Sequence, residues 1–249
     1  MHEAAQAAAA PSTTDDMGPL HHSVALAVGA LAVAHAAPAP CQRSPALRRA
    51  FGVRDRLADP HAVALTFDDG PHPDGTPATL EVLRAAGIRA TFFLVGEQVQ
   101  RDPAIAAEIA AAGHDVGVHG HRHRNLLRLA PARVGEDLLR GEEAIACACG
   151  ITPRLYRPPY GILTTAALVH ARRHGFAILL WTRWGRDWRA RATPATIADD
   201  AAAGLRGSEV ILLHDADHYS ASGSWQRTVA ALPAIIERIH DAGLAFCTG

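Results

Sequence analysis

The 249-residue sequence lacks several features that mark common classes of protein. Its formal net charge is only −1, which excludes a strongly basic nucleic-acid-binding protein. No apolar run reaches the ~18 residues of a membrane-spanning helix, so a multi-pass membrane protein is excluded. No lysine is present, and the four cysteines form no C-x-x-C pair and no zinc-ligand spacing. Cysteine usage therefore says little about the redox compartment.

Histidine, by contrast, is abundant. The chain has 15 histidines, and several of them lie in tight clusters. Histidine is the commonest metal ligand and the side chain that most readily carries a proton near pH 7. The clusters are therefore the first place to look for a functional site.

The first 60 residues differ in composition from the rest. Residues 1–19 are alanine-rich and polar, which predicts disorder. Residues 20–37 form an apolar run of small residues, which predicts either an export signal or membrane tether, or an extra helix on the domain. Residues 45–60 form an arginine-bearing polar connector. We therefore predict a lead segment over residues 1–60, an exported or membrane-associated protein, and one domain over residues 61–249.

The second part of the chain alternates short apolar runs with helical stretches. Three predicted helices begin at the pairs Thr76-Pro77, Asp102-Pro103 and Thr193-Pro194, and each ends at a glycine. Seven apolar runs predict strands covered on both faces: residues 63–67, 90–95, 114–119, 154–157, 177–182, 209–214 and 244–247.

This alternation predicts one α/β domain with parallel strands and right-handed crossovers. A closed (β/α) barrel and an open doubly wound sheet both fit the pattern. No G-x-G-x-x-G motif follows the first strand, so a dinucleotide-binding sheet loses its main support.

Two adjacent carboxylates, Asp68 and Asp69, follow the first predicted strand. Carboxylates this close repel each other, so they need a compensating cation or a shared proton. The alternative is a plain turn, because Asp-Gly-Pro is good turn chemistry.

A histidine cluster follows the third predicted strand. His119 and His123 are four residues apart, so both rings can face one point if the chain coils there, and His121 can share a face with His119 if the chain stays extended. A solvated polar loop is the alternative. With a carboxylate from a neighbouring strand, the two histidines would form a metal site that leaves positions open for water and substrate.

Other polar or aromatic residues also lie at strand ends. Tyr160 follows two prolines, which hold its amide in a rigid turn. Trp181, Trp184 and Trp188 suit a wall for a sugar ring or, alternatively, fill the core. His214 directly follows an apolar strand. The carboxyl ends of parallel strands are where α/β barrels build active sites.

Together these residues resemble the polysaccharide deacetylases, the NodB-homology enzymes of carbohydrate esterase family 4. The resemblance covers residues 61–248 and implies a distorted (β/α) barrel with about seven parallel strands. It rests on five motifs in order: Thr66-Phe67-Asp68-Asp69-Gly70, His119-x-x-x-His123, Arg157-Pro158-Pro159-Tyr160-Gly161, Asp187-Trp188 and Leu212-Leu213-His214.

The resemblance implies a role for each matching residue. Asp69, His119 and His123 would bind a divalent metal, most often zinc or alternatively cobalt. Asp68 would be the general base, Arg157 would orient Asp68, and Asp187 would hold Arg157. The Tyr160 amide would stabilise the oxyanion, Trp188 and Leu212 would line the acetyl pocket, and His214 would protonate the leaving amine.

Three positions depart from the family pattern. Gly120 stands where the family usually has Ser or Thr, Arg124 replaces the usual Pro, and His121 replaces a residue that is often aromatic. We expect metal ligation to survive, and we expect a surface role for His121, with an extra ligand or a subsite residue as alternatives.

The resulting functional prediction is a metal-dependent hydrolase that removes N-acetyl groups from N-acetylglucosamine-type carbohydrates. The alternatives are the same chemistry on a small acetylated sugar or other non-polymeric amide, and a non-catalytic carbohydrate-binding module. The expected partner is a carbohydrate and not a nucleic acid, with association to a membrane or cell wall. The oligomeric state stays open.

Overall fold

A computed structural model describes residues 19–249. The disorder predicted for residues 1–19 therefore lies, apart from Pro19, outside the described residues. Contacts divide the chain between Ala34 and His35, and the unit over residues 35–249 is compact. The domain boundary near residue 60 stays a prediction.

Helix α1 (Pro19–Ala36) covers the apolar run of the lead segment. Its 18 residues correspond to about 27 Å, against a hydrocarbon core of about 30 Å. Many of its residues are alanines, and three histidines lower its hydrophobicity. Within the part of the chain that the structure describes, no helix is long and apolar enough to cross a membrane. The prediction of membrane association through residues 20–37 is therefore wrong.

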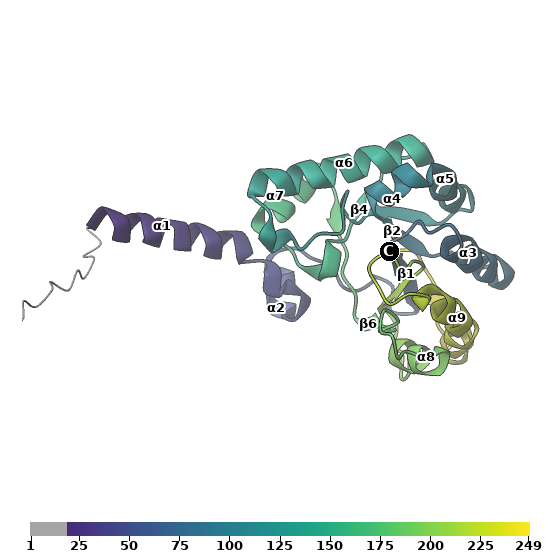
Figure 1. Cartoon of the computed structure of the whole chain (residues 1–249). Helices are drawn as coiled ribbons and strands as arrows, with labels where there is room; N and C mark the ends of the chain where they lie inside the picture. Colours follow the sequence, from purple (N-terminus) through teal and green to yellow (C-terminus); the bar gives the residue numbers. More distant parts are fainter. Residues whose placement is uncertain (1–18) are drawn as a thin grey trace, which may run out of the picture. The chain divides into compact units, whose positions relative to one another are not determined.

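The compact unit is built on one sheet of parallel strands (Figure 1). Its order is β5-β4-β3-β2-β1-β7-β6, and the last strand, β8, pairs with the start of β1. The predicted distorted (β/α) barrel is confirmed. The strands are β1 (Ala62–Asp68), β2 (Thr91–Leu94), β3 (Asp115–Val118), β4 (Leu155–Tyr156), β5 (Ala177–Ile178), β6 (Arg183–Trp184), β7 (Val210–His214) and β8 (Ala245–Phe246).

The predicted strand over residues 177–182 is shorter than expected, because only Ala177–Ile178 form β5 and a separate strand, β6, follows at Arg183–Trp184. β5 pairs with β4 at one end of the strand order, and β6 pairs with β7 at the other end. An extended chain gains at most about 3.6 Å per residue, so the short link over residues 179–182 requires the two end strands to lie close together. The sheet therefore curls into an incomplete barrel.

The helices cover the sheet and mostly begin and end where the sequence predicts. Gly87 ends α3 with a left-handed φ of 66°, and Thr193 forms a capping box at the start of α8. Helix α3 begins at Gly75, one residue before the predicted Thr76-Pro77 start, and Asp102 gives α5 no side-chain cap. The helices are α2 (Pro45–Ala50), α3 (Gly75–Ala86), α4 (Gly96–Arg101), α5 (Pro103–Ala111), α6 (Pro131–Cys149), α7 (Thr165–Arg173), α8 (Pro194–Ala202) and α9 (Ser224–Asp241).

Residues 39–57 also pack onto the sheet. Cys41 and Val53 are buried in the main core. The backbone of Arg54 donates to the carbonyl of Ile178 and accepts from the amide of Leu180, at the end of β5. This segment overlaps the connector predicted over residues 45–60 and is thereby fixed beside the gap between β5 and β6.

Candidate functional site

The polar residues at the carboxyl ends of the strands surround one cavity of about 260 Å³. The carboxyl ends of β1, β3 and β7 and the loops after them bring together side chains that are up to 152 positions apart in sequence. Most of the predicted site residues meet here. The lining residues are Gln42, Asp68, Asp69, His119, His123, Tyr160, Trp181, Trp184, Trp188, His214, Tyr219 and Ser220.

Asp69, His119 and His123 form a compact group of possible metal ligands. One ligand atom from each residue lies within 4.8 Å of the other two. Nε2 of His123 is 3.3 Å and Nε2 of His119 is 3.6 Å from Oδ1 of Asp69. That oxygen is buried and has no hydrogen-bond partner in the structure. A buried, unpaired carboxylate oxygen facing two imidazoles is the arrangement that a divalent cation would satisfy.

Burial controls the charge of this trio. It raises the pKa of Asp69 to about 7, with the neighbouring charge of Asp68 adding to the effect. It lowers the pKa of both His119 and His123 to about 3. Both imidazoles are therefore neutral at physiological pH, which is the form that binds a metal.

Surrounding groups hold the two histidine rings in place. Nδ1 of His119 lies 2.7 Å from the carbonyl oxygen of Arg157, so the ring donates there and presents its Nε2 lone pair to Asp69. The ring of His123 stacks on Tyr219 at 4.4 Å and meets Tyr160 edge-on at 4.5 Å. Both ligands are thus oriented before any metal binds.

The loop between the histidines is supported from α6. Gly120 has a left-handed φ of 84°, and a Cβ placed on it would lie 2.8 Å from Oδ2 of Asp137. The same oxygen accepts hydrogen bonds from the amides of His121 and Arg122, at 2.9 and 3.4 Å. Asp137 thus supports the loop at Gly120, the position where the family usually has Ser or Thr. His121 is only 2% exposed, so the surface role expected for it is wrong.

Asp68 is paired with a fully buried arginine. Nη1 of Arg157 lies 2.7 Å from Oδ1 of Asp68, and its Nε and Nη2 donate to the carbonyls of Leu179 and Leu180. Burial raises the pKa of Asp68, and the attraction of Arg157 opposes this rise. Oδ2 of Asp68 lies on the His119 side, 3.8 Å from Nε2 of that ring.

Asp187 has different partners from the one expected. It accepts hydrogen bonds from the backbone amide of His214 at 2.7 Å, from Nδ1 of the same ring at 2.9 Å and from the Thr228 hydroxyl at 2.8 Å. Asp187 therefore holds His214, whereas carbonyls at the β5–β6 link hold Arg157. Burial alone would lower the pKa of His214, but Asp187 raises it to about 10.

Of the three remaining predicted site residues, two line the cavity and one does not. Tyr160 lines the cavity with a left-handed φ of 60° in its turn. Trp188 lines it too and packs edge-on to His214 at 5.7 Å. Leu212 is buried on β7 and is not among the lining residues. The roles assigned to these three residues stay predictions.

Sequence reasoning missed four residues of this region. Gln42 comes from the lead segment, and Tyr219 and Ser220 come from the loop after β7. Asp215 is fully buried, accepts a hydrogen bond from the Thr76 hydroxyl, and would lie 2.6 Å from a Cβ placed on Gly70. It therefore packs against the turn that follows Asp69. Its place directly after His214 was the only sequence signal.

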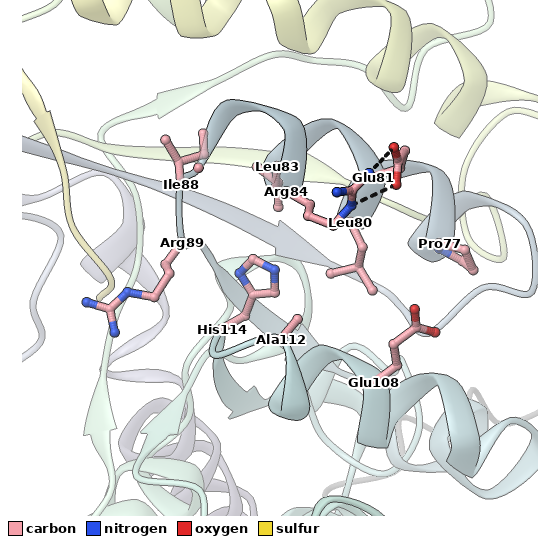
Figure 2. Close-up of a pocket in the computed structure, with 11 residues that line it drawn as sticks. Pro77, Leu80, Glu81, Leu83, Arg84, Ile88, Arg89, Glu108, Ala112 and His114 are labelled. Carbon is pink, nitrogen blue, oxygen red and sulfur yellow. Dashed lines mark hydrogen bonds and ion pairs between the residues drawn. The ribbon is translucent and has the colours of Figure 1, made fainter.

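A second, larger cavity of about 480 Å³ lies at the amino ends of β2 and β3 (Figure 2). Residues of α3 and α5 line it, together with His114. It shares no lining residue with the first cavity.

Comparisons with known proteins agree with this geometry. Residues 55–179 match the family model described as polysaccharide deacetylase. A chitooligosaccharide deacetylase of Bradyrhizobium sp. (strain ANU 289) is 36% identical over 205 residues, which cover 80% of this chain and 92% of that protein. A peptidoglycan-N-acetylglucosamine deacetylase of Bacillus cereus is 34% identical, over 75% of this chain and 66% of the relative.

A solved structure shows the same similarity. The match to the crystal structure of the Bc1960 peptidoglycan N-acetylglucosamine deacetylase covers 79% of this chain and 89% of the chain in that structure. Its TM-score is 0.73 and its sequence identity is 32%. The chain therefore belongs to the polysaccharide deacetylase family.

Proposed function

We propose that this protein is a metal-dependent deacetylase that hydrolyses the acetamido group of N-acetylglucosamine-type carbohydrates. The observation that carries the proposal is the convergence of three buried groups in one cavity. These are the Asp69, His119 and His123 trio, the Asp68–Arg157 pair and the Asp187–His214 pair. Each pair supplies one proton-transfer function that amide hydrolysis needs.

The trio would hold a divalent metal, for which two imidazoles and one carboxylate favour zinc, with cobalt as the alternative. Such an ion would lower the pKa of bound water to about 7 and would polarise a carbonyl oxygen. The donor set fits this ion because Oδ1 of Asp69 is otherwise unpaired and both imidazoles are neutral.

The chain's own residues handle the protons. Oδ2 of Asp68 accepts a proton from the attacking water, while Arg157 holds Oδ1 of the same carboxylate. His214 donates a proton from Nε2 to the leaving amine nitrogen, because Asp187 occupies its Nδ1. The Tyr160 amide donates to the carbonyl oxygen as negative charge develops there, which for one such donor contributes about 3–4 kcal/mol.

The cavity walls support a sugar as substrate. Trp181, Trp184 and Trp188 all line the cavity, and aromatic faces suit the apolar face of a sugar ring. The relatives are named for chitooligosaccharide and peptidoglycan, so a polymer of acetylated amino sugars is the leading substrate. A small acetylated sugar is the second candidate, because the cavity itself is only about 260 Å³.

Acetate release by the purified full chain tests the proposal. We expect turnover of N-acetylglucosamine oligomers that a chelator abolishes and that zinc or cobalt restores. Free N-acetylglucosamine, tested beside the oligomers, separates the two substrate candidates. Turnover that is absent on every substrate, or insensitive to chelation, would contradict the proposal.

A further inference from the structure

The segment over residues 39–57 concentrates positive charge. It holds five of the 24 arginines of the chain but only one of its 25 acidic residues. The chain as a whole carries a formal net charge of −1, so the remaining residues are net acidic. The positive charge is therefore local to this segment, which we call the basic segment.

The basic segment lies next to the cavity of about 260 Å³ that is lined by Asp69, His119 and His123, which we call the catalytic cavity. It lines a neighbouring cavity of about 470 Å³, which we call the basic groove. Gln42 and Trp181 line both cavities, so the groove and the site share a wall. Four arginines and one aspartate belong to the lining of the basic groove: Arg43, Arg48, Arg49, Arg56 and Asp55.

Only one of these arginines is neutralised. Arg48 bonds to Asp55 at 2.8 Å and to the carbonyls of Cys41 and Gln42, which fixes the segment in place. Arg43, Arg49 and Arg56 are exposed, and no carboxylate of residues 19–249 pairs with them.

Glu209, the acidic residue whose backbone pairs with that of Arg56, does not neutralise this arginine, because its carboxylate already binds other groups. The backbone of Arg56 forms a β-bridge with Glu209, but the Glu209 carboxylate accepts from Arg183 and from the amide of Arg206. Three guanidinium groups thus face solvent beside the site with no internal counter-charge.

We propose that the basic groove binds carboxylate groups of the glycan substrate, on sugars next to the residue whose acetamido group enters the catalytic cavity. The proposal rests on the function proposed above. Guanidinium groups match the planar, two-oxygen geometry of a carboxylate, and a neutral chain of N-acetylglucosamine offers no such group. The preferred substrate is therefore an anionic acetylated glycan.

Two tetrasaccharides of equal length test this substrate preference. One is the neutral N-acetylglucosamine tetramer, and the other alternates N-acetylglucosamine with N-acetylmuramic acid bearing free carboxylates. We expect the wild-type chain to deacetylate the carboxylated substrate with kcat/KM about tenfold higher at low salt. The difference should shrink as salt screens the exposed charges. Equal kcat/KM on the two substrates would overturn the proposal.

A triple variant, Arg43→Gln, Arg49→Gln and Arg56→Gln, locates the effect. We expect it to lose the preference for the carboxylated substrate and to keep its kcat/KM on the neutral one. Arg89→Gln is the matched control, because Arg89 is also exposed and unpaired but lines the second cavity. An equal loss on both substrates in the triple variant would assign the arginines a structural role instead.

Failure of the proposed function can be told apart from failure of this inference. If neither tetrasaccharide nor free N-acetylglucosamine is turned over, the deacetylase assignment fails. Titration calorimetry with the carboxylated tetrasaccharide then still decides the groove's role. Binding by the wild type that weakens about tenfold in the triple variant supports the groove, and equal binding overturns it.

Discussion

The two cavities lie at opposite ends of β3, and each receives a histidine from this strand's flanks. His114 immediately precedes β3 and lies between α3 and α5 (Figure 2). His119 immediately follows β3 and lies in the catalytic cavity. Both side chains are buried, and burial lowers the pKa of both rings. Burial and a lowered pKa therefore do not distinguish the two histidines.

The partners of the two rings do distinguish them. Nδ1 of His114 accepts a hydrogen bond from the amide of Ala90, and its ring packs against Phe92. Nε2 of His119 instead faces the carboxylates of Asp68 and Asp69. The first ring supports the fold, whereas the second presents an electron pair to a carboxylate that lacks a partner.

The carboxylates differ in the same way. At the amino end, Glu81 is exposed and pairs with its helix neighbour Arg84, as Figure 2 shows. At the carboxyl end, Asp68 and Asp69 are each only 2% exposed. The amino-end cavity is nevertheless the larger of the two. Buried carboxylates, and not the size of the cavity, therefore distinguish the carboxyl end from the amino end of this barrel.

The largest expected effect comes from removing the proposed base. Asp68→Asn should lower kcat by about 10²–10⁴-fold, because the amide cannot accept a proton from water. Zinc affinity, measured by titration, should be retained, since Asp68 lies outside the trio. Glu81→Gln at the other cavity is the control and should leave kcat unchanged. An Asp68→Asn protein that folds, binds zinc and keeps its kcat would exclude Asp68 as the base.

Removing the hydrogen bonds that Asp137 of α6 accepts from the loop between His119 and His123 should weaken metal binding. Asp137→Ala removes the oxygen that holds the amides of His121 and Arg122, so zinc affinity should fall about 10–100-fold. Competition with a chromophoric chelator measures this change. Glu136→Ala, on the same helix and exposed, is the matched control. Unchanged affinity in Asp137→Ala would show that the loop holds its shape without this contact.

The pH profile should report the Asp187–His214 pair. His214 must be protonated to act as the acid, so activity is lost as the pH rises through its pKa, which Asp187 raises to about 10. Asp187→Asn should therefore move the alkaline limb of kcat/KM to lower pH by about one unit or more. A cation in the trio would lower the pKa of His214 in both proteins, so the difference between them is the quantity to measure. An alkaline limb that does not move would separate Asp187 from the titration of His214.

The smallest effect on catalysis is expected at the amino end. His114→Ala removes the acceptor of the Ala90 amide, so the free energy of unfolding should fall by about 1–3 kcal/mol. Urea denaturation measures this loss. Acetate release per folded molecule should stay unchanged. A large drop in kcat at full folding would mean that the two ends of the barrel are functionally coupled.

Much of the fold and the metal trio could be predicted because the signals are local. Apolar runs separated by capped helices predict parallel strands, and their carboxyl ends share one edge. The four-residue spacing of His119 and His123 predicts two ligands that join a carboxylate from a neighbouring strand, and the resemblance names Asp69 as that carboxylate. The structure brings ligand atoms of all three residues within 4.8 Å of one another. The end of β5 at Ile178 and the start of a second strand at Arg183 could not be predicted, because residues 177–181 form one apolar run and only the pairing partners separate the two strands.

The position of the lead segment relative to the site could not be predicted either. Its arginines were visible in the sequence, but nothing local indicated that they would line a groove beside Trp181. The apolar run before them resembled a membrane tether, but among residues 19–249 no helix is long and apolar enough to cross a membrane.

The sequence by itself determined which chemical groups stand at the ends of the strands and which family the chain resembles. The tertiary structure alone decided their partners: Asp187 binds His214 and not Arg157, Asp137 supports the metal loop, and residues 39–57 reach the site. These contacts join positions that are far apart in the chain. A hydrogen bond or a shared cavity between such positions depends on how the crossovers close the barrel, and no local pattern of residues encodes that distance.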